Sequence, residues 1–323
     1  MTYRQLGKTD LFVSRIGFGT APLGNVYGDM PDSDCERAVH HAIDSGINFF
    51  DTAPYYGDTL SEARLGMALK GKRDQVIIAT KAGHYVGQNG QEFDFSPGRI
   101  SQSLEASLRR LQTDTIDLFQ LHDIEFASID YILNESLPVL QRFKGEGKVR
   151  YIGITGYPLH VLQAVAEQAP VDSIQSYCHY NLLNTSLTKL LLPFAKQHRI
   201  GIINSSLLHM GMLTQQGAPK WHPAPELVHD AVAKLREFAR ERRADIARIA
   251  LQFALANSEI DVACVGIRRV EEIDQNMALL DSPIDHDLLA RIQQMLEPVM
   301  NISWQLGLAE NHEPGAVSQR RIS

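Results

Sequence analysis

The sequence predicts an α/β fold, a (β/α)8 TIM barrel with an N-terminal β-hairpin and extra helices. Two observations predict it: short apolar, β-branched runs alternate with segments of helical periodicity, and eight such runs occur along the 323 residues. Strands that alternate with helices pair in parallel, and eight strand–helix units close into a barrel. A barrel of about 250 residues with insertions accounts for this length. We therefore expect a single domain over residues 1–323.

Each predicted strand is a short apolar run bounded by turn residues or by a helical pattern. The eight runs are residues 16–19, 47–51, 76–81, 116–122, 151–155, 173–177, 201–205 and 262–266. Amphipathic segments lie between them, and one has its apolar face at Ile100, Leu104, Leu108 and Leu111. Asp245 is suited to cap the N-terminus of another predicted helix.

Three segments lie outside the eight units. Residues 2–14 predict a hairpin that turns at Gly7–Asp10 and plugs the floor of the barrel. The stretch 207–245 is too long for one strand–helix loop, and it predicts an extra helix from Pro225. A further helix follows the eighth unit, and residues 298–323 form a C-terminal tail that contains Trp304.

Composition and charge exclude several classes of protein. Apolar residues make up 44% of the chain, which excludes wholesale disorder, and the net charge of −7 argues against nucleic acid as a partner. No apolar run is long enough to span a membrane, and the polar N-terminus carries no signal-peptide pattern. Three scattered cysteines are typical of a reducing compartment. We expect a cytoplasmic monomer or homodimer.

Polar side chains end three of the apolar runs. Asp51, Lys81 and His122 end the second, third and fourth predicted strands, and Tyr56 follows Asp51 by five residues. Taken singly, each has an ordinary explanation, such as a turn cap or a satisfied core histidine. Active sites of such barrels lie at the carboxyl ends of the strands, so we expect these four side chains to meet at the barrel mouth.

This combination of residue types suits proton transfer by a phenol. A free tyrosine has a pKa of about 10, which is too high for efficient acid–base work near neutrality. The ammonium of Lys81 would stabilise the phenolate of Tyr56 and lower its pKa, and Asp51 would balance the buried positive charge. His122 would hydrogen-bond the reacting oxygen and fix its position.

The chain resembles the aldo-keto reductase superfamily over nearly its whole length. The matching segments, in order, are "GFGTAPLG", "GINFFDTAPYYGDTLSEARLG", "VIIATKAG", "IDLFQLHD" and "GKVRYIGITG". This resemblance implies an oxidoreductase with a nicotinamide cofactor. It places Asp51, Tyr56, Lys81 and His122 on the catalytic positions of the superfamily.

Other segments resemble one subfamily, the L-galactose dehydrogenases. They are "LHDIEFASID", "SYCHYNLLNTSLTKLLLPF", "GMLTQQGAPKWHPAPEL" and "LEPVMNISW". The resemblance implies NAD-dependent oxidation of the anomeric carbon of a small-molecule sugar, L-galactose, to the lactone. L-Fucose and D-arabinose stay open as substrates because their rings share the geometry near the reacting carbon. The alternatives are reaction with another aldehyde such as pyridoxal, and a nucleotide-binding, redox-sensing regulatory subunit.

No G-x-G-x-x-G follows a predicted strand, so a Rossmann-type cofactor site is not expected. A barrel binds phosphate near the loops after strands seven and eight. Glu272 falls where relatives commonly carry a phosphate-binding arginine, and this favours NAD, whereas Arg268 and Arg269 leave NADP as the less favoured alternative. The cofactor-binding candidates are Gly19, Thr20, Thr155, Gln175, Ser205, Ser206, Leu208, Gly211, Gly266, Arg268, Glu272 and Asn276.

Two of these positions depart from the superfamily pattern. Thr155–Gly156 stands where Ser-Asn often holds the nicotinamide carboxamide, and we expect Thr155 and Gln175 to hold it here. Ser205 stands where a tyrosine often stacks on the nicotinamide ring.

Polar and aromatic residues near the predicted mouth are candidates for sugar binding. Asp123, His84 and Trp221 are the substrate-binding candidates, and ordinary loop roles are the alternative for each. Twelve histidines suggest a metal site, but no H-E-x-x-H motif occurs and no catalytic metal is expected. In the sequence Cys178–His179–Tyr180, a buried thiol is favoured over a nucleophile, because neighbouring strand residues point to opposite faces.

Overall fold

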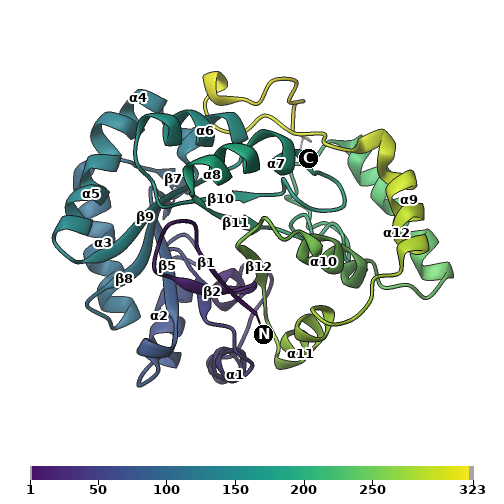
Figure 1. Ribbon diagram of the computed structural model, residues 1–323, viewed down its shortest axis with the longest axis horizontal. Helices are drawn as coiled ribbons and strands as arrows, with labels where there is room; N and C mark the ends of the chain where they lie inside the picture. Colours follow the sequence, from purple (N-terminus) through teal and green to yellow (C-terminus); the bar gives the residue numbers. More distant parts are fainter. Residues whose placement is uncertain (1, 320–323) are drawn as a thin grey trace.

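Eight parallel strands form a closed barrel in the computed structural model, which describes residues 2–319 (Figure 1). The end of the predicted tail, residues 320–323, lies outside the described residues. The barrel strands are β3 (Ile16–Gly19), β4 (Phe49–Asp51), β5 (Ile77–Ala82), β8 (Ile116–Leu121), β9 (Val149–Gly156), β10 (Ser173–Tyr177), β11 (Gly201–Ser205) and β12 (Val262–Gly266). Strand β12 pairs with β3 and closes the ring. The predicted (β/α)8 barrel is confirmed.

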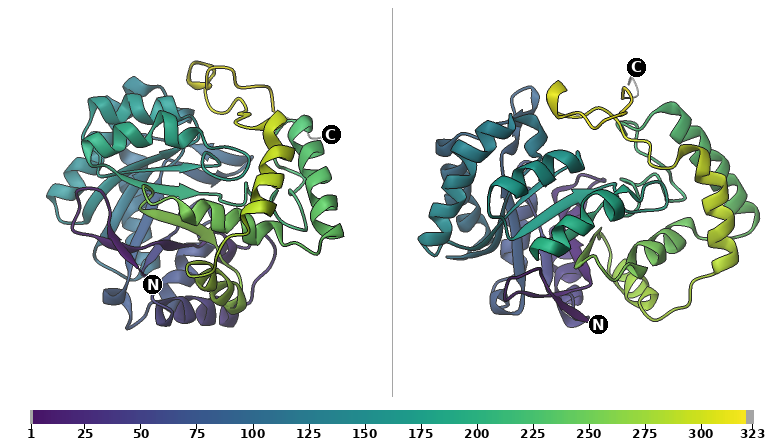
Figure 2. Two further views of the ribbon diagram at one scale, coloured as in Figure 1. Left: turned by 45° about the vertical axis from the view of Figure 1, so that its right-hand side comes forward. Right: turned by 45° about the horizontal axis from the view of Figure 1, so that its top comes forward.

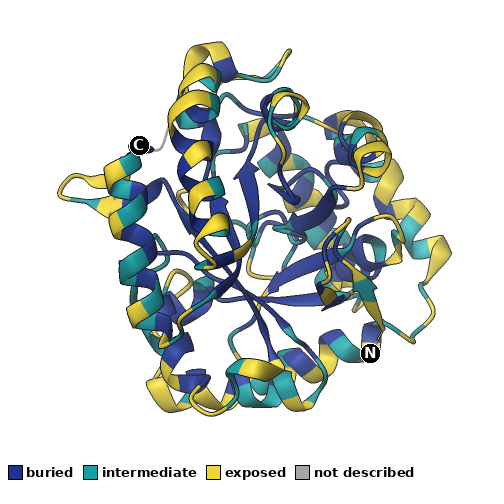
Figure 3. Ribbon diagram, turned by 60° about the vertical axis from the view of Figure 1, so that its left-hand side comes forward, coloured by how far each residue is buried: buried dark blue, intermediate teal, exposed yellow. Residues whose placement is uncertain are grey.

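Helices surround the barrel, and the apolar faces of most of them pack on its outer surface. They are α1 (Asp32–Asp44), α2 (Leu60–Ala68), α3 (Pro97–Leu111), α4 (Ile129–Tyr131), α5 (Leu137–Gly145), α6 (Leu159–Gln168), α7 (Ser186–Leu190), α8 (Leu192–His198), α9 (Glu226–Glu241), α10 (Ile246–Ala256), α11 (Val270–Leu279) and α12 (His286–Leu296). Figure 3 shows the buried strands at the centre and the exposed outer faces of the helices.

Local chemistry explains where these helices begin and end. In α3, the Ser96 side chain accepts a hydrogen bond from the Arg99 N–H and Pro97 starts the first turn, while Gln112 ends the helix in a left-handed conformation. Asp245 caps α10 as predicted, with its carboxylate accepting from the Arg248 N–H. The predicted apolar face of α3 is buried at Ile100, Leu104 and Leu111 and half-buried at Leu108.

The N-terminal hairpin closes the floor of the barrel. Strands β1 (Tyr3–Gln5) and β2 (Phe12–Ser14) pair antiparallel, as predicted. Leu6, Leu11 and Val13 are buried and form one cluster with inward-facing residues of the barrel strands: Phe49, Ile77, Ala79, Leu118, Ile203, Val262 and Cys264. Gly7 has a φ of +54°, and a Cβ there would lie 2.3 Å from the Gly201 nitrogen, so the turn needs glycine to seat this closely.

The predicted helix in the stretch 207–245 is α9, which begins at Glu226 and packs beside α12 (Figure 2). A second hairpin, β6 (His84–Gly87) with β7 (Gly90–Phe93), was not predicted. Gly83 makes this hairpin possible. Its φ of +114° turns the chain out of β5, and a Cβ there would lie 2.4 Å from the Phe95 ring.

The C-terminal tail crosses the loops at the carboxyl ends of the barrel strands. The ring of Trp304 stacks on Tyr157, with centroids 4.5 Å apart. The Leu308 N–H donates to the Glu125 carbonyl at 2.9 Å, and Asn311 Nδ2 donates to the carbonyls of Glu125 and Ala127, each at 2.8 Å. The tail is therefore fixed to the loop that follows β8, at the mouth of the barrel.

Candidate active site

A buried ion pair lies at the centre of the barrel mouth. Lys81, near the end of β5, and Asp51, at the end of β4, point inward, and Lys81 Nζ lies 2.8 Å from Asp51 Oδ1. The Thr52 carbonyl also accepts from Lys81 Nζ at 2.8 Å. Both side chains are almost fully buried, and desolvating two charges is costly unless each finds a partner. Here each charge has one.

Tyr56 lies beside this pair on the loop after β4. Its hydroxyl is 3.4 Å from Lys81 Nζ. The loop approaches the β3 loop so closely that two glycines are required. A Cβ on Gly24 would lie 2.4 Å from the Tyr56 carbonyl oxygen, and a Cβ on Gly57, whose φ is +65°, would lie 2.0 Å from the Gly24 carbonyl oxygen. This approach fixes Tyr56 over Lys81.

The expected lowering of the Tyr56 pKa is not found. Burial raises the pKa of Tyr56 well above its ordinary value, and the nearby charge of Asp51 adds to the rise. The expectation gave Asp51 the role of balancing the Lys81 charge. Asp51 lies closer to that ammonium than the phenol does, so it also offsets the effect of the ammonium on Tyr56. Tyr56 is therefore a neutral phenol near neutral pH in the described chain.

His122 follows β8 and faces Tyr56 edge-on, with ring centroids 5.9 Å apart. Burial lowers the pKa of His122 to about 3, so the ring is neutral across the physiological range. A neutral imidazole can both donate and accept a hydrogen bond, although His122 Nδ1 has no hydrogen-bond partner in the structure. The structure thus brings the four predicted catalytic side chains together in one cluster.

Two substrate-binding candidates join the cluster as a pair. His84 Nδ1 lies 2.8 Å from Asp123 Oδ2, and His122 Nε2 lies 3.8 Å from the same oxygen. Burial opposes ionisation of Asp123, but its pairing with His122 and the hydrogen bond with His84 outweigh burial and lower its pKa. Tyr55 and Phe93 stack on the His84 ring from centroid distances of 3.6 Å and 4.3 Å. A carboxylate therefore lies beside the phenol and the neutral imidazole.

Hydrogen-bonded amides support Asp51 from the far side of the barrel. Gln175 Nε2 donates to Asp51 Oδ2 at 3.3 Å and to Ser205 Oγ at 2.8 Å. Gln120 Nε2 donates in turn to Gln175 Oε1 at 3.0 Å. Inward residues of β4, β8, β10 and β11 thus share one polar layer, and this layer holds the Asp51 carboxylate in place.

The geometry agrees with what known proteins indicate. The sequence profile of the Aldo/keto reductase family matches residues 15–297. The chain belongs to this family. It is 44% identical over 319 residues to an L-galactose dehydrogenase of Arabidopsis thaliana, covering 95% of this chain and 98% of that protein.

Other relatives and solved structures agree. A D-threo-aldose 1-dehydrogenase of Pseudomonas sp. is 30% identical over 82% of this chain and 89% of its own length. An aldo-keto reductase from Bacillus halodurans, solved in its holo form, superposes with a TM-score of 0.77 at 28% identity, over 97% of this chain and 100% of that one. The family resemblance inferred from the motifs is confirmed.

Members of this family are oxidoreductases that use nicotinamide cofactors, and the residues at the mouth of this barrel fit such a group. Gly266 is exposed and Gly211 partly exposed, and an added Cβ would make only ordinary contacts there, at 3.5 Å and 3.7 Å. Thr155 Oγ1 accepts from the Asp123 N–H at 3.2 Å, which leaves its own hydrogen free to donate.

The start of α11 carries the charges expected near the adenosine ribose. Glu272 Oε2 accepts from the Arg268 N–H at 2.8 Å, and Glu272 Oε1 lies 3.2 Å from Arg269 Nε. A carboxylate thus occupies the first turn of α11, the end of a helix that otherwise attracts phosphate. The Arg268 guanidinium instead donates to the carbonyls of Tyr27 and Asp29.

The other cofactor candidates divide between the mouth and the interior. Ser205, Ser206, Leu208 and Gly211 lie at the end of β11 and in the turns that follow, and each is partly exposed. Gly19, Thr20 and Asn276 are buried. The Thr20 hydroxyl donates to the Asp51 carbonyl at 2.9 Å, so Thr20 supports the β4 end in this structure.

Three aromatic residues near the mouth were not among the candidates. Tyr55 stacks on His84, and Tyr27 lies 6.4 Å from the exposed Trp221. Tyr177 ends β10 on the same side as Gln175, and burial raises its pKa well above the ordinary value, with Asp123 contributing. The alternation of inward residues along β10 was a signal for Tyr177, whereas Tyr27 and Tyr55 lie on loops without periodicity.

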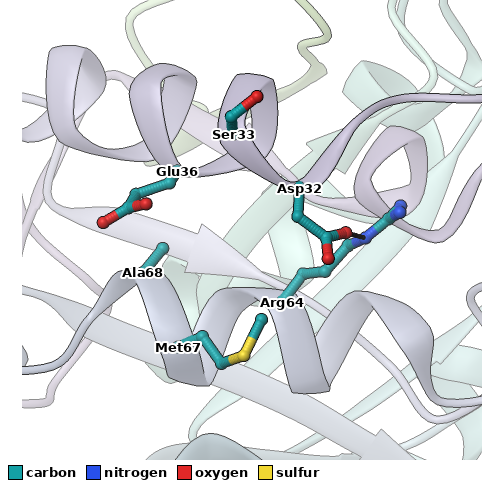
Figure 4. A pocket seen from close by; sticks show the side chains of 6 residues that line it. All are labelled: Asp32, Ser33, Glu36, Arg64, Met67 and Ala68. Carbon is teal, nitrogen blue, oxygen red and sulfur yellow. Dashed lines mark hydrogen bonds and ion pairs between the residues drawn. The ribbon is translucent and has the colours of Figure 1, made fainter.

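Two other features lie apart from this site. A surface pocket between α1 and α2 is crossed by the Arg64–Asp32 ion pair of 2.7 Å, and none of the predicted site residues lines it (Figure 4). Cys178 is fully buried, and burial raises its pKa, so its thiol stays protonated. Among residues 2–319, no helix is long and apolar enough to cross a membrane.

Proposed function

We propose that this protein is an NAD-dependent aldose 1-dehydrogenase that oxidises the anomeric carbon of L-galactose to the lactone. The observation that carries the proposal is the 44% identity to an L-galactose dehydrogenase over 95% of the chain. The match covers 98% of that relative, so it extends over nearly the whole barrel with its loops, which in such folds determine the substrate. Related sugars such as L-fucose and D-arabinose are the competing substrates.

The residues of the cluster divide the proton chemistry among them. Tyr56 takes the proton of the anomeric hydroxyl in its phenolate form, and Lys81, fixed by Asp51 and the Thr52 carbonyl, stabilises the negative charge of that phenolate before the proton arrives. His122, neutral and facing Tyr56, donates a hydrogen bond to the same sugar oxygen. A bound nicotinamide would supply the acceptor for the hydride that leaves the anomeric carbon.

A polar wall beside Tyr56 supports a sugar rather than an apolar aldehyde. The Asp123 carboxylate accepts hydrogen bonds from ring hydroxyls, and His84 holds that carboxylate in place at 2.8 Å. Trp221, exposed on the long loop, and Tyr27 offer aromatic faces of the kind that pack on sugar rings. Pyridoxal carries fewer hydroxyl groups than an aldohexose and would use less of the hydrogen-bonding capacity of Asp123.

The cofactor preference follows from the α11 N-terminus. Glu272 accepts hydrogen bonds from ribose hydroxyls and repels a 2′-phosphate, which supports NAD over NADP. We expect Glu272→Arg to move the ratio of kcat/KM for the two cofactors toward NADP by about tenfold or more, since a charge-assisted hydrogen bond contributes about 1.5–3 kcal/mol. Glu271→Arg on the neighbouring exposed position is the matched control.

The test of the proposal is turnover of a panel of free sugars and pyridoxal with NAD⁺ and NADP⁺, followed by nicotinamide absorbance. L-Galactose should give the highest kcat/KM, and the lactone should be the first product because a cyclic hemiacetal is oxidised. A higher kcat/KM for pyridoxal, or free acid formed with no lactone, would contradict it. Nucleotide binding without turnover of any of these compounds would favour a redox-sensing regulatory subunit.

We also propose that the protein works in the cytoplasm as a monomer or homodimer. The three cysteines, Cys35, Cys178 and Cys264, are free and buried, which suits a reducing compartment. Size-exclusion chromatography with light scattering measures the oligomeric state.

A further inference from the structure

Two imidazoles and a carboxylate converge beside Tyr56 in an arrangement that the proton chemistry does not require. His84, His122 and Asp123 each offer one ligand atom, and these atoms all lie within 4.8 Å of one another. Catalysis in the proposed function uses His122 and one oxygen of Asp123. In that chemistry the second buried imidazole, His84, only holds the Asp123 carboxylate, at 2.8 Å.

The ring nitrogens that face the Asp123 carboxylate are His84 Nδ1 and His122 Nε2. His84 and His122 are both more than nine-tenths buried, and His84 Nε2 and His122 Nδ1 have no hydrogen-bond partner. Tyr55 and Phe93 both stack on the His84 ring, so the orientation of this ring is set before a ligand binds.

The charges of the site favour a cation at this position. The Lys81 ammonium is 2.8 Å from Asp51, and that pair is neutral as a whole. Asp123 is the remaining carboxylate in contact with the two imidazoles, at 2.8 Å from His84 and 3.8 Å from His122. In a tetrahedral zinc site, bonds of about 2.0–2.2 Å place neighbouring ligand atoms roughly 3.3 Å apart. The nitrogen–oxygen separations of 2.8 Å and 3.8 Å lie on either side of that value.

We infer that His84, His122 and Asp123 form an inhibitory site for a borderline-soft divalent cation such as Zn²⁺. Two imidazoles and one carboxylate are a common ligand set for this ion, with the fourth position left to water. The bound cation occupies His122 and Asp123, so it competes with the sugar for the same atoms. The inhibition rests on the proposed function, whereas the binding of the cation does not.

The first experiment measures binding without catalysis. An untagged, chelator-treated protein is titrated with Co²⁺, and the visible d–d absorption of a four-coordinate ion is recorded and then displaced with Zn²⁺. His84→Phe removes one ligand and keeps the aromatic stack with Tyr55 and Phe93, and it should weaken binding by at least about 100-fold. The matched control is His41→Phe. It removes another imidazole–carboxylate pair, in which His41 Nε2 lies 2.7 Å from Asp274 Oδ1 outside the barrel, and it should leave cobalt binding unchanged.

The outcomes separate the two proposals. Absence of the four-coordinate spectrum in the wild type would overturn the inference. So would a loss of cobalt affinity in His41→Phe together with unchanged affinity in His84→Phe. A thiolate-to-cobalt charge-transfer band would also overturn it and assign the ion to a cysteine. Competitive inhibition of L-galactose oxidation by Zn²⁺, relieved in His84→Phe, is expected in addition. If L-galactose is not oxidised, the cobalt titration still decides the metal site.

Discussion

The two ends of the barrel are built from the same strands and have opposite chemistry. At the floor, inward residues such as Phe49 and Leu118 pack against the hairpin residues Leu6 and Leu11 in an apolar cluster. Two positions further along β4, at the mouth, the inward residue is Asp51, which is paired with Lys81. Since side chains alternate with a period of two, one strand supplies both ends. Stability is concentrated at one end and chemistry at the other.

The largest expected effect tests the mouth. Tyr56→Phe removes the oxygen that takes the proton and keeps the ring beside Lys81, so kcat should fall by about 10²–10⁴-fold, the typical contribution of acid–base catalysis. Steady-state kinetics measures kcat, and a thermal melt measures the melting temperature of the same variant. The melting temperature should stay within a few degrees of wild type. A variant with near-normal kcat would remove Tyr56 from the mechanism.

The floor should respond in the opposite way. Leu11→Ala deletes a buried side chain of the hairpin and should lower the free energy of unfolding by about 2–5 kcal/mol, with kcat/KM of the folded enzyme unchanged. Phe12→Ala, at a neighbouring residue that is 60% exposed, is the control and should have little effect. Denaturant titration measures the free energy of unfolding of both variants and of the wild type. A large loss of kcat in folded Leu11→Ala would show that the two ends are not separate.

The pH dependence of the mouth is the third test. Oxidation requires Tyr56 as phenolate, and its pKa is raised well above the ordinary value. The rate of the chemical step should therefore rise about tenfold per pH unit between roughly pH 7 and 9, without a plateau. His122, with a pKa of about 3, should add no acid limb in this range. A plateau near neutrality would mean that the bound cofactor lowers the pKa of Tyr56.

The smallest expected effect concerns the tail. Asn311→Ala removes two hydrogen bonds to the carbonyls of the loop that carries Asp123, and KM for the sugar should rise by roughly three- to tenfold with little change in kcat. Gln319→Ala is the control, because its amide donates to Gln305 within the tail itself. Steady-state kinetics with varied sugar concentration measures the effect. Equal changes in both variants would contradict a specific link from tail to site.

The periodic parts of the chain were predictable, and the reason is physical. All eight strands and the floor hairpin follow from hydrophobic runs and turn residues, and α10 begins at its predicted cap, Asp245. The β6–β7 hairpin was missed because its residues are largely exposed and polar, with no apolar alternation beyond Tyr85. Its turn is nevertheless visible in the sequence Gly87–Gly90, with glycine at both ends.

The candidate site was predictable in its members and less so in its electrostatics. Strand-end position alone brought Asp51, Lys81 and His122 together, since parallel strands all end at one rim. The predicted direction of the Tyr56 pKa shift was wrong. The shift depends on burial of the phenol and on how closely Asp51 approaches Lys81, and neither can be read from a sequence. The second contact of Glu272, with Arg269, likewise appears only once α11 is built.

The closure of the ring between its first and last strands has a consequence for synthesis of the chain. Arg4, in the hairpin, donates to the carbonyl of Ile260, which lies 256 residues away in the sequence. At about 5–20 residues per second, a ribosome needs on the order of ten to fifty seconds to make the segment that completes this contact. During that interval Leu6, Leu11 and Val13 have no finished cavity to enter, so the first residues translated are among the last to reach their native position.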